Sequence, residues 1–568
     1  MVRRFAFLVA PLLLTGSVVD ARTAATPIKS VVRGMVSAAD PRAAAAGAEI
    51  LRQGGSATDA AIAVMLALNV VEPQSSGIGG GGFLIWADRK GDVETYDGRE
   101  TAPAAATADW FLDASGKPLP FPRAVQSGLS VGVPGNLRLA ALAHKRHGKL
   151  PWPALFGPAI RLAREGFSIS ERGREFLLNA KDRAAADPYG RAMFYDAARQ
   201  PLAAGTIVKN PALAATFERI ARQGADAFYS GPEAQALAGH VASATPKPAG
   251  MTAADLSGYQ AKLRPPLCGA YRGYRICGMG PPSSGATTVY AILAQLERFD
   301  LAKLGPGSPV AWHLFSESQR LAYADRDKYL ADTDFVQVPV AGLMDRAYLA
   351  RRGALISETT RLGIVPAGSP AGVALALRPG TGPDEHGTSN FAVADRDGDG
   401  ISYTSTVEGS FGSGLMAGGF YLNNELTDFS FVPQANGQPV ANRVEGGKRP
   451  RSSMAPTAVF DRQGHLFLVI GAAGGSTIPV QVAKALIGVL DWGLPVDKAI
   501  ALPMLYSPGD TDIVEPGSPL LAMKPQLEAL GHHLAERPLP LKANGVEWLG
   551  GRWLGAADPR SEGAAVAG

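Results

Sequence analysis

The chain has 568 residues, 46% of them apolar, and its 55 Lys and Arg residues nearly balance 51 Asp and Glu residues. A chain of this length and composition buries a large core, which excludes an acidic disordered protein or a fibrous one. The net charge of +4 is spread without long Lys or Arg runs, so the basic surface of a nucleic-acid-binding protein is not expected. The 67 glycines and 43 prolines predict many sharp turns and disfavour an all-helical fold.

Residues 1–21 have the pattern of a signal peptide. Two arginines precede an apolar run over residues 5–14, and small side chains follow at Val19 and Ala21. This spacing predicts export, with cleavage after Ala21. The apolar run is too short to span a bilayer comfortably, and no other stretch approaches the roughly 18 apolar residues of a membrane helix. We therefore expect a periplasmic or secreted protein without a stable membrane span.

Helix signals begin with a proline-opened segment over residues 41–53, which a glycine pair ends. Ser56 and Asp59 then form a predicted capping box for a buried apolar helix that ends near Val71. The other elements expected in chain order are a glycine run over 75–82 that leads into a strand over 83–88, a helical region over 135–245, a helix over 309–330, a mobile loop over 363–387, short strands from 388 to about 470, and helices around 480–503 and 523–532. Strands enclosed by helical segments predict stacked α and β layers.

The only two cysteines, Cys268 and Cys277, flank a predicted turn at Arg272 and Gly273. In a two-residue hairpin centred on this turn they face each other as a non-hydrogen-bonded pair, with Cα atoms roughly 4.5 Å apart. That separation allows a disulfide in an oxidising compartment. Two buried free thiols are the alternative, and neither state makes the cysteines catalytic.

Three motifs match the sequence patterns of known sites but lack a structural feature or ligand that each site requires. The run GIGGGG at 77–82 has a helix before it and a strand after it, which reverses the order of a dinucleotide-binding site. The run GLSVG around Ser130 is followed by Val133 and Pro134, which oppose the helix that a nucleophile elbow requires. The run DRDGDG at 395–400 lacks the final glutamate of a calcium loop and predicts a tight turn.

The eight histidines show neither the HExxH spacing nor cysteine partners. A zinc site is therefore not expected. The pairs His144 with His147 and His532 with His533 are expected at the surface.

A threonine remains as the candidate nucleophile. Thr388 lies in the segment GTSNFAVAD, directly after Gly387, whose carbonyl is unhindered. A threonine hydroxyl needs an adjacent base, and an N-terminal threonine provides its own α-amine. Attack by Thr388 on the Gly387 carbonyl would give an ester whose hydrolysis creates that N-terminus. If Ala394 pairs with Gly400 across the following turn, Thr406 lies opposite Thr388, where its hydroxyl is placed to polarise the nucleophile.

Ten segments extend this pattern along the chain: GMVSAADPRAAAAGAEILRQGGSATDAAIA, VVEPQSSGIGGGGF, DGRETAPAAA, SVGVPG, MGPPSSGATT, GTSNFAVAD, FYLNNELTDFS, KRPRSSMAPT, GAAGGS and ADPR. In this order they make the chain resemble, from about residue 33 to 565, the γ-glutamyltranspeptidase (γ-glutamyltransferase/glutathione hydrolase) family of N-terminal nucleophile hydrolases. The resemblance implies an αββα four-layer sandwich, an α/β fold that agrees with the predicted layers. It also implies autocleavage between Gly387 and Thr388 into a large subunit, residues 22–387, and a small subunit, residues 388–568, which form one heterodimeric unit.

By the resemblance, Thr388 is the nucleophile, Thr406 holds its hydroxyl, and Gly474 and Gly475 supply the N–H groups of an oxyanion hole. The implied reaction is a ping-pong acyl transfer. Thr388 attacks a γ-glutamyl amide, releases the amine, which is cysteinylglycine when the donor is glutathione, and holds a γ-glutamyl ester. Water then yields glutamate, or an amino acid or dipeptide acceptor yields a new γ-glutamyl peptide. This reaction needs no metal or organic cofactor.

The resemblance also implies a donor site. Arg99 is expected to take the donor's α-carboxylate through its guanidinium fork, together with Ser452 and Ser453. Asp428 is expected to hold the α-ammonium, with help from Glu425. Without the family context, Arg99 would be taken for a surface charge.

Three features depart from the family pattern. Glu408 stands where the family usually has an asparagine near the substrate's amino group, and it either strengthens ammonium binding or alters donor preference. Ser389 and Asn390 follow Thr388 in place of the usual threonine and histidine, which bears on the processing rate. The segment between residues 429 and 452 is short and has no tyrosine, which predicts an open site that favours larger donors and hydrolysis.

Two alternatives to this function stay open. A cephalosporin or glutaryl-amide acylase on the same scaffold would share Thr388, but its substrate lacks an α-ammonium and would not need Asp428. The acid pair and Arg99 favour γ-glutamyl donors. The other alternative is a secreted binding protein with an inactive site, which would remain one uncleaved chain.

Overall fold

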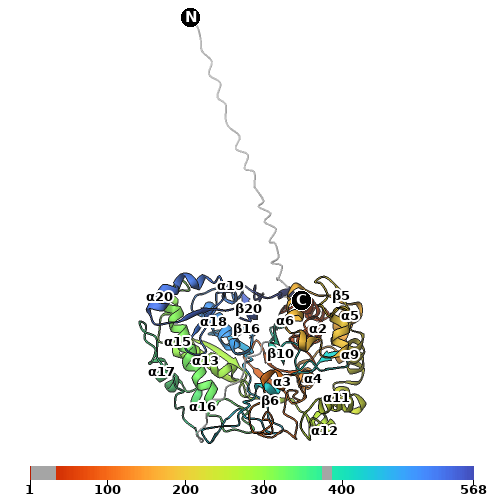
Figure 1. Cartoon of the computed structure of the whole chain (residues 1–568). Coiled ribbons are helices and arrows are strands. Elements are labelled where there is room, and N and C mark those ends of the chain that lie inside the picture. Colours follow the sequence, from red (N-terminus) through yellow and green to blue (C-terminus); the bar gives the residue numbers. More distant parts are fainter. Residues whose placement is uncertain (2–33, 374–386) are drawn as a thin grey trace. The chain divides into compact units, whose positions relative to one another are not determined.

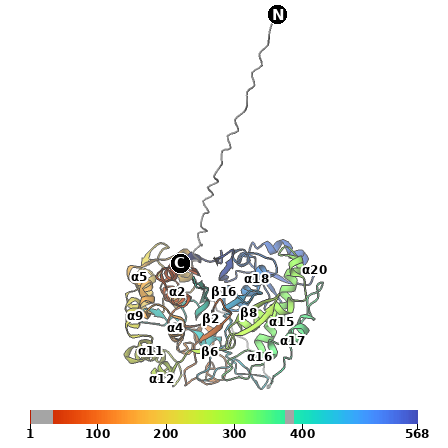
Figure 2. The ribbon, with the colours of Figure 1, turned by 180° about the vertical axis from the view of Figure 1, so that it is seen from behind.

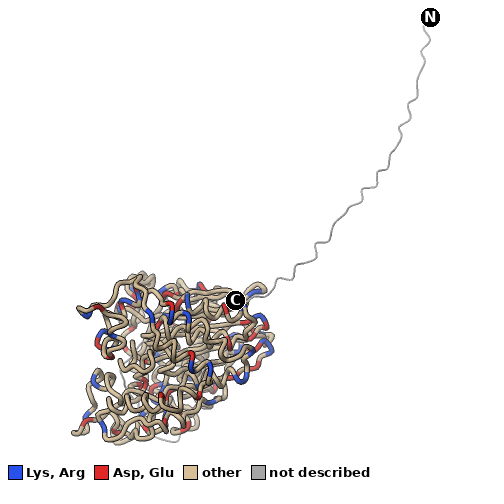
Figure 3. The backbone as a smooth tube through the Cα atoms, turned by 90° about the vertical axis from the view of Figure 1, so that its right-hand side faces the viewer, with Lys and Arg blue, Asp and Glu red and all other residues tan. Residues whose placement is uncertain are grey.

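The structure, a computed structural model, describes Met1, residues 34–373 and residues 387–568. Apart from Met1, the predicted signal peptide, residues 1–21, lies outside the described residues, as does most of the loop predicted at 363–387. Within the described ranges, no helix is both long and apolar enough to cross a membrane. Acidic and basic residues are interspersed along the backbone rather than gathered by sign (Figure 3).

A seven-stranded antiparallel sheet carries the candidate nucleophile. Its strand order is β22-β1-β9-β10-β2-β3-β6. In that order the strands span Ala564–Ala567, Met35–Ala38, Gly387–Ala394, Gly400–Glu408, Gly81–Ala87, Val93–Gly98 and Lys262–Arg264. The predicted register between β9 and β10 is confirmed, since Ala394 faces Gly400 and Thr388 faces Thr406.

A second antiparallel sheet of six strands lies against the first. Its order is β21-β20-β16-β15-β8-β7. In that order the strands span Arg552–Ala557, Lys542–Leu549, Leu466–Ala473, Thr457–Phe460, Tyr274–Gly278 and Leu267–Tyr271. Strands β9 and β10 of the first sheet contact β16 of the second, so the two central strand pairs form the middle of the fold.

Helices cover the outer face of each sheet. On the first sheet lie α1 (Pro41–Arg52), α2 (Ala57–Val71) and α4 (Asn136–His147), and on the second lie α13 (Gly285–Leu296), α18 (Ile478–Leu490) and α19 (Val496–Ala501). Figures 1 and 2 show α2 and α18 on opposite sides of the strands. The αββα sandwich expected from the sequence is confirmed.

The remaining predicted helices are also present. The region expected to be helical contains α5 (Gly157–Glu165), α6 (Glu171–Asn179), α9 (Pro211–Gln223) and α11 (Gly231–Ser243), and α15 (Pro309–Tyr329) and α20 (Lys524–Ala529) follow later in the chain. The capping box of α2 forms as predicted, with Ser56 and Asp59 each accepting a backbone N–H of the other. Because α2 has almost no polar side chains, it is buried along its whole length.

A polar side chain of β9 faces the second sheet. Phe391 and Val393 join the apolar cluster around α1 and α2, so the alternate residue Asn390 faces the second sheet. Its side-chain amide donates to Thr404 Oγ1 over 2.9 Å. Gly471 of β16 has no space for a side chain, because an added Cβ would lie 2.3 Å from the Asn390 amide nitrogen. This close approach packs β9 tightly against β16 of the second sheet.

The cysteine hairpin forms in the predicted register. Arg272 and Gly273 have φ angles of 52° and 86°, as a two-residue hairpin turn requires. Cys268 therefore faces Cys277, and a disulfide joins them with their Cα atoms 4.1 Å apart. The disulfide ties the edge strand β7 to β8 of the second sheet.

Candidate active site

Thr388 is the second residue of β9 and lies beside Thr406 of β10. Their hydroxyl oxygens are 3.1 Å apart, and the Thr406 hydroxyl donates to the carbonyl oxygen of Gly387 over 2.9 Å. The backbone N–H of Glu408 donates to the Thr406 hydroxyl oxygen over 2.8 Å. Thr388 is only 5% exposed, so the protein surrounds this group of bonds.

These bonds fix the direction of the hydroxyl protons. Thr406 has one hydroxyl proton, which it gives to the carbonyl of Gly387. Its oxygen therefore accepts the proton of the Thr388 hydroxyl. A continuous path for protons runs from Thr388, through Thr406, to the carbonyl group that directly precedes Thr388 in the chain.

A β-bulge between Thr406 and Glu408 creates this arrangement. Glu408 has a φ angle of 74°, in the left-handed region that residues other than glycine adopt rarely. Gly387 has no space for a side chain, since an added Cβ would lie 2.4 Å from the carbonyl oxygen of Gly409. Gly80 has no space for a side chain either, since an added Cβ would lie 1.9 Å from the backbone carbonyl oxygen of Thr406.

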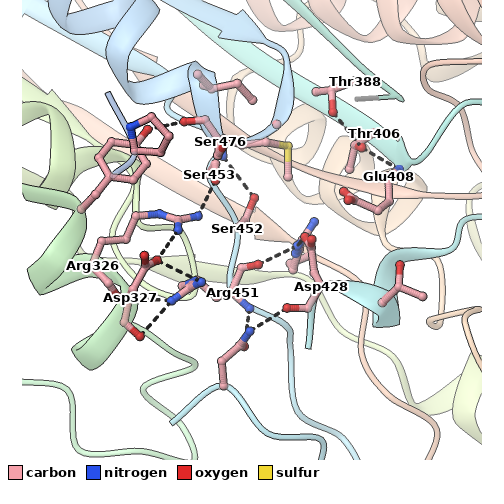
Figure 4. A pocket seen from close by; sticks show the side chains of 18 of the residues that line it. Arg326, Asp327, Thr388, Thr406, Glu408, Asp428, Arg451, Ser452, Ser453 and Ser476 are labelled. Carbon is pink, nitrogen blue, oxygen red and sulfur yellow. Dashed lines mark hydrogen bonds and ion pairs between the residues drawn. The ribbon is translucent and has the colours of Figure 1, made fainter. Parts of the chain in front are cut away.

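A cavity of about 250 Å³ opens beside Thr388 (Figure 4). Eight of the ten predicted site residues line it: Arg99, Thr388, Thr406, Glu408, Asp428, Ser452, Ser453 and Gly475. Glu425 and Gly474 are not part of the lining, although both adjoin residues that are. The lining also includes residues without a predicted role, among them Tyr323, Arg326 and Asp327 of α15 and Tyr506 of β17 (Leu505–Tyr506). Arg451 and Ser476 line it too, and they lie within the segments KRPRSSMAPT and GAAGGS.

Arg99 is 1% exposed and forms ion pairs with Glu425 and Asp428. Its Nε donates to the carbonyl oxygen of Pro450 over 3.1 Å, and its Nη2 donates to that of Arg451 over 3.0 Å. The residue expected for the α-carboxylate and the two expected for the α-ammonium thus form one ion-pair cluster. Arg99 is buried, whereas its local sequence alone predicts a position at the surface.

The cluster contains more acid than base. Glu408, Glu425 and Asp428 place carboxylate oxygens within 4.8 Å of one another. Arg99 forms ion pairs with two of them, Glu425 and Asp428. The adjacent Glu100 is fully buried, its carboxylate oxygens have no hydrogen-bond partner among the described residues, and burial raises its pKa to about 8. Glu100 is therefore mostly protonated at neutral pH, and the carboxylates around Arg99 favour a cationic group.

The predicted oxyanion glycines form the turn between β16 and α18. Gly474 and Gly475 have φ angles of 128° and 59°, and an added Cβ on Gly474 would lie 2.2 Å from the carbonyl oxygen of Pro540. Gly475 and Ile478, the first residue of α18, both line the cavity. The N-terminus of this 13-residue helix carries a partial positive charge, which favours an anion at this end of the cavity.

A buried ion pair contacts the backbone of the nucleophile. Lys542 Nζ lies 2.7 Å from Glu72 Oε2 and donates to the carbonyl oxygen of Thr388 over 3.3 Å. Ser389 donates to Glu72 over 2.7 Å. Burial lowers the pKa of Lys542, while Glu72 opposes this change. Glu72 belongs to a motif quoted for the family resemblance, but nothing in the sequence near Lys542 marks it.

The rejected nucleophile and the calcium-like run have structural roles. Ser130 is fully buried away from the cavity, and its hydroxyl donates to the carbonyl oxygen of Val125 over 2.7 Å. In DRDGDG, Asp395 accepts from the backbone N–H groups of Asp397 and Asp399. It also accepts from Ala57, so it ties the predicted tight turn to the start of α2.

The expectation for two histidine pairs was partly wrong. His532 is 1% exposed, because its ring bonds to His313 over 2.6 Å and to Asp512 over 2.8 Å. His147 is half-buried and stacks on Trp86 with the ring centroids 3.9 Å apart. Side chains distant in sequence hold these two rings in place, and no local sequence pattern predicts such contacts.

Comparisons with known proteins agree with this site. The sequence model of the family described as Gamma-glutamyltranspeptidase matches residues 43–568. The "Glutathione hydrolase proenzyme" of Bacillus subtilis is 36% identical over 553 residues, covering 94% of this chain and 91% of the relative. The crystal structure of cephalosporin acylase from Bacillus halodurans superposes with a TM-score of 0.81 at 27% identity, covering 96% and 99% of the two chains. That of Helicobacter pylori gamma-glutamyltranspeptidase gives 0.54 at 37% identity, covering 57% and 91%.

The four layers, with a threonine near the start of a central strand, define an N-terminal nucleophile hydrolase. Within this class, the chain belongs to the gamma-glutamyltranspeptidase family. The family and the enzyme class predicted from the sequence, γ-glutamyl transfer and hydrolysis, are thereby confirmed.

Proposed function

We propose that the chain is exported, cleaves itself before Thr388, and then acts as a γ-glutamyltransferase and glutathione hydrolase. The observation that carries the proposal is the hydrogen-bonded path from Thr388 through Thr406 to the carbonyl of Gly387. In this scheme residues 22–387 become the large subunit and residues 388–568 the small subunit of a heterodimer.

Autocleavage follows from the proton path. Thr388 Oγ1 attacks the carbonyl carbon of Gly387 and passes its proton to Thr406, which gives its own proton to the carbonyl oxygen. The C–N bond between Gly387 and Thr388 then breaks, the proton moves to the departing nitrogen, and an ester remains. Water hydrolyses the ester, which leaves a carboxylate on Gly387 and restores the hydroxyl of Thr388 beside a new α-amine.

The same threonine then serves the substrate. Its α-amine takes the hydroxyl proton as Oγ1 bonds to the γ-carbonyl carbon of the donor. The resulting oxyanion is placed toward Gly474 and Gly475, near the N-terminus of α18. Collapse breaks the C–N bond, and the leaving amine takes the proton from the ammonium of Thr388. Attack by water or an acceptor amine on the ester reverses these proton transfers and frees the enzyme, without a metal or organic cofactor.

The acid-rich cluster explains the choice of a γ-glutamyl donor. Glu408, Glu425 and Asp428 outnumber Arg99, so an α-ammonium restores charge balance in a largely buried site. A metal ion would meet the Arg99 guanidinium among the same oxygens, and we assign the cluster to the ammonium. Ser452 and Ser453 lie on the adjoining wall, where their hydroxyl and backbone groups suit the α-carboxylate.

The test combines processing with turnover. Purified wild type and Thr388→Ala are compared by SDS-PAGE, N-terminal sequencing and release of nitroaniline from γ-glutamyl-p-nitroanilide. We expect two fragments with a new Thr388 terminus and nitroaniline release in the wild type, and one inert chain in the variant. A wild type that remains a single inert chain would refute the proposal and favour an inactive binding protein.

An acylase is the second candidate, because the cephalosporin acylase structure covers nearly the whole chain. Glutaryl-p-nitroanilide differs from γ-glutamyl-p-nitroanilide by the missing α-ammonium and separates the two functions. We expect kcat/KM to be at least about tenfold higher for the γ-glutamyl compound, since it alone satisfies the acid cluster. Processing with a preference for the glutaryl compound would instead establish the acylase.

A further inference from the structure

The ammonium group of Lys542 lies beside the backbone of Thr388. It donates to the carbonyl oxygen of Thr388 and to Ser389 Oγ, each over 3.3 Å, and to Glu72 Oε2 over 2.7 Å. An ammonium has three N–H donors, so these three acceptors satisfy it. Lys542 is 4% exposed and Glu72 3%, and solvent therefore screens the charge of Lys542 only weakly.

The backbone of Lys542 is anchored beside the oxyanion turn. Lys542 begins β20 and faces Ala473, the last residue of β16, which directly precedes the two oxyanion glycines. Its N–H donates to Gln481 Oε1 over 3.0 Å, and Gln481 Nε2 donates to the carbonyl oxygen of Ala473 over 2.7 Å. These bonds fix the ammonium close to Thr388, although Lys542 itself does not line the cavity.

The ion pair presents its positive end to the nucleophile. Lys542 contacts the carbonyl oxygen of Thr388, whereas Glu72 contacts Lys542 and the hydroxyl of Ser389. That carbonyl oxygen is only a few covalent bonds from the nitrogen of Thr388, which becomes an α-amine after the proposed cleavage. A positive charge so close opposes protonation of the amine.

The charged side chains around the pair and the nucleophile also include Asp40, Arg42, Arg172 and Glu408. Arg172 and Asp40 act on Lys542 with opposite sign, so Glu72 remains its direct partner. Glu408 favours a protonated amine, but it lines the cavity, where solvent screens its charge more than that of Lys542. The lysine is therefore expected to have the larger effect on the amine.

We propose that Lys542, held by Glu72, keeps the α-amine of cleaved Thr388 free of a proton at neutral pH. The inference rests on the proposed function, because the amine exists only after cleavage. An α-amine has an ordinary pKa of roughly 7.7–8.0, so without a neighbouring cation most of it would be protonated at pH 7 and unable to take the hydroxyl proton of Thr388. Lys542 acts through the amine and does not contact the substrate, which makes it a positioning residue.

The pH dependence of kcat/KM for γ-glutamyl-p-nitroanilide measures the protonation of the amine, since kcat/KM reports groups of the free enzyme. We expect the activity of the wild type to fall on the acid side with an apparent pKa of about 7 or lower, roughly one unit below the ordinary value. An apparent pKa of about 8 or higher would overturn the inference without the need for a variant.

Variants assign this pKa to the lysine. Lys542→Met removes the charge with little change in length, so the apparent pKa should rise by about one unit, with a loss of about tenfold in kcat/KM near pH 6 and little loss near pH 9. Lys542→Arg retains the charge and should stay within about half a unit of the wild type. Because the substrate is the same throughout, a shift between variants belongs to the enzyme.

Lys484→Met is the matched control. Lys484 is also buried, but it donates to the carbonyl oxygens of Ile500 and Leu502 and does not line the cavity. Its loss removes a buried ammonium without changing the charge beside Thr388, so the apparent pKa should equal that of the wild type. An unchanged apparent pKa in Lys542→Met, or an equal shift in Lys484→Met, would contradict the assignment.

The outcomes separate this inference from the proposed function. Nitroaniline release with a wild-type apparent pKa of about 8 would leave the proposed function standing and overturn only the role of Lys542. Absence of cleavage and turnover in the wild type would overturn both. If Lys542→Met is not cleaved, the double variant Glu72→Gln/Lys542→Met, which leaves no unpaired buried charge, should show the upward shift instead. If neither is cleaved, the wild-type profile and Lys542→Arg decide the question.

Discussion

Thr406 has more to do than hold the nucleophile, since its single hydroxyl connects Thr388 to the carbonyl of Gly387. Thr406→Val keeps the shape of the side chain but breaks this path, and we expect autocleavage to slow by about a hundredfold. Thr406→Ser should process within about tenfold of the wild type. A time course by SDS-PAGE measures both rates. Thr404→Val, which loses a neighbouring buried hydroxyl, is the control, and equal slowing there would contradict a role in proton transfer.

Glu408 belongs to the acid cluster and departs from the asparagine usual in the family. Glu408→Gln removes a negative charge with little change in size, so we expect the KM for γ-glutamyl-p-nitroanilide to rise about tenfold. The preference over glutaryl-p-nitroanilide should shrink in parallel. Glu445→Gln, outside the cavity, should change neither quantity. A Glu408→Gln variant with an unchanged KM would show that the charge at this position does not contribute to donor binding.

Glu100 links stability to pH. Burial raises its pKa from 4.5 to about 8, so the folded chain keeps a proton that the unfolded chain releases. The free energy of unfolding therefore falls as pH rises from about 5 to 8, by at most about 1.4 kcal/mol per pH unit from this group. Glu100→Gln should gain stability relative to the wild type over that range. Urea unfolding of both chains in the uncleaved Thr388→Ala background checks this, and a pH-independent difference would refute it.

At this scale the sequence predicts the residues that act through a motif and misses those that act through distant contacts. Eight of the ten expected residues line one cavity, because short family segments mark them. No role was predicted for Arg326 of α15, because it meets Asp327 and Arg451 only where α15 approaches a segment more than a hundred residues later. The ion pairs of Arg99 were not foreseen for the same reason.

Among the elements, α15 carries a buried histidine chain to the C-terminal region. His313 donates from Nε2 to the carbonyl oxygen of Ser357 and so accepts at Nδ1 from His532. His532 Nδ1 in turn forms a hydrogen bond of 2.8 Å with Asp512 Oδ2. Burial lowers the pKa of His313, whereas the pKa of Asp512 falls because hydrogen bonds and the charge of His532 outweigh the opposing effect of burial.

Both lowered pKa values destabilise the fold in acid. Below about pH 6.5 the unfolded chain takes up a proton at His313 that the folded chain resists, so the free energy of unfolding falls as pH decreases. His313→Gln should lose less stability than the wild type between pH 7.5 and 5.5. His465 is exposed, so His465→Gln is the control. It should keep the wild-type dependence of the free energy of unfolding on pH, as measured by urea unfolding. A His313→Gln slope equal to that of the wild type would contradict the prediction.

Element predictions succeeded where periodicity and turn residues act locally. The hairpin at Arg272 and Gly273 and the β9 to β10 register were obtained from turn positions alone. The pairing of β9 with β1, and of β16 with β20, involves strands separated by long stretches of chain. Such pairing depends on packing between layers, and the family resemblance implied the four layers without saying which distant strands pair.

Over the whole molecule, the proposed cleavage divides both sheets between two fragments. In the first sheet, β1, β2, β3 and β6 precede Thr388, while β9, β10 and β22 contain or follow it; the second sheet has β7 and β8 before it and four strands after it. The fragments should therefore co-elute in a one-to-one ratio in size-exclusion chromatography and separate only after denaturation. Separation in native buffer would contradict this interleaving.

The first and last strands of the chain are neighbours. Strand β1 pairs with β22, and the N–H of Gly568 donates to the carbonyl oxygen of Gly34 over 2.9 Å. The other partner of β1 is β9, which begins beyond the middle of the chain. Both edges of β1 are therefore covered only by strand residues that follow the proposed cleavage point. The N-terminal fragment alone would leave β1 without either of its partners, so the large subunit depends on the small one to complete the first sheet.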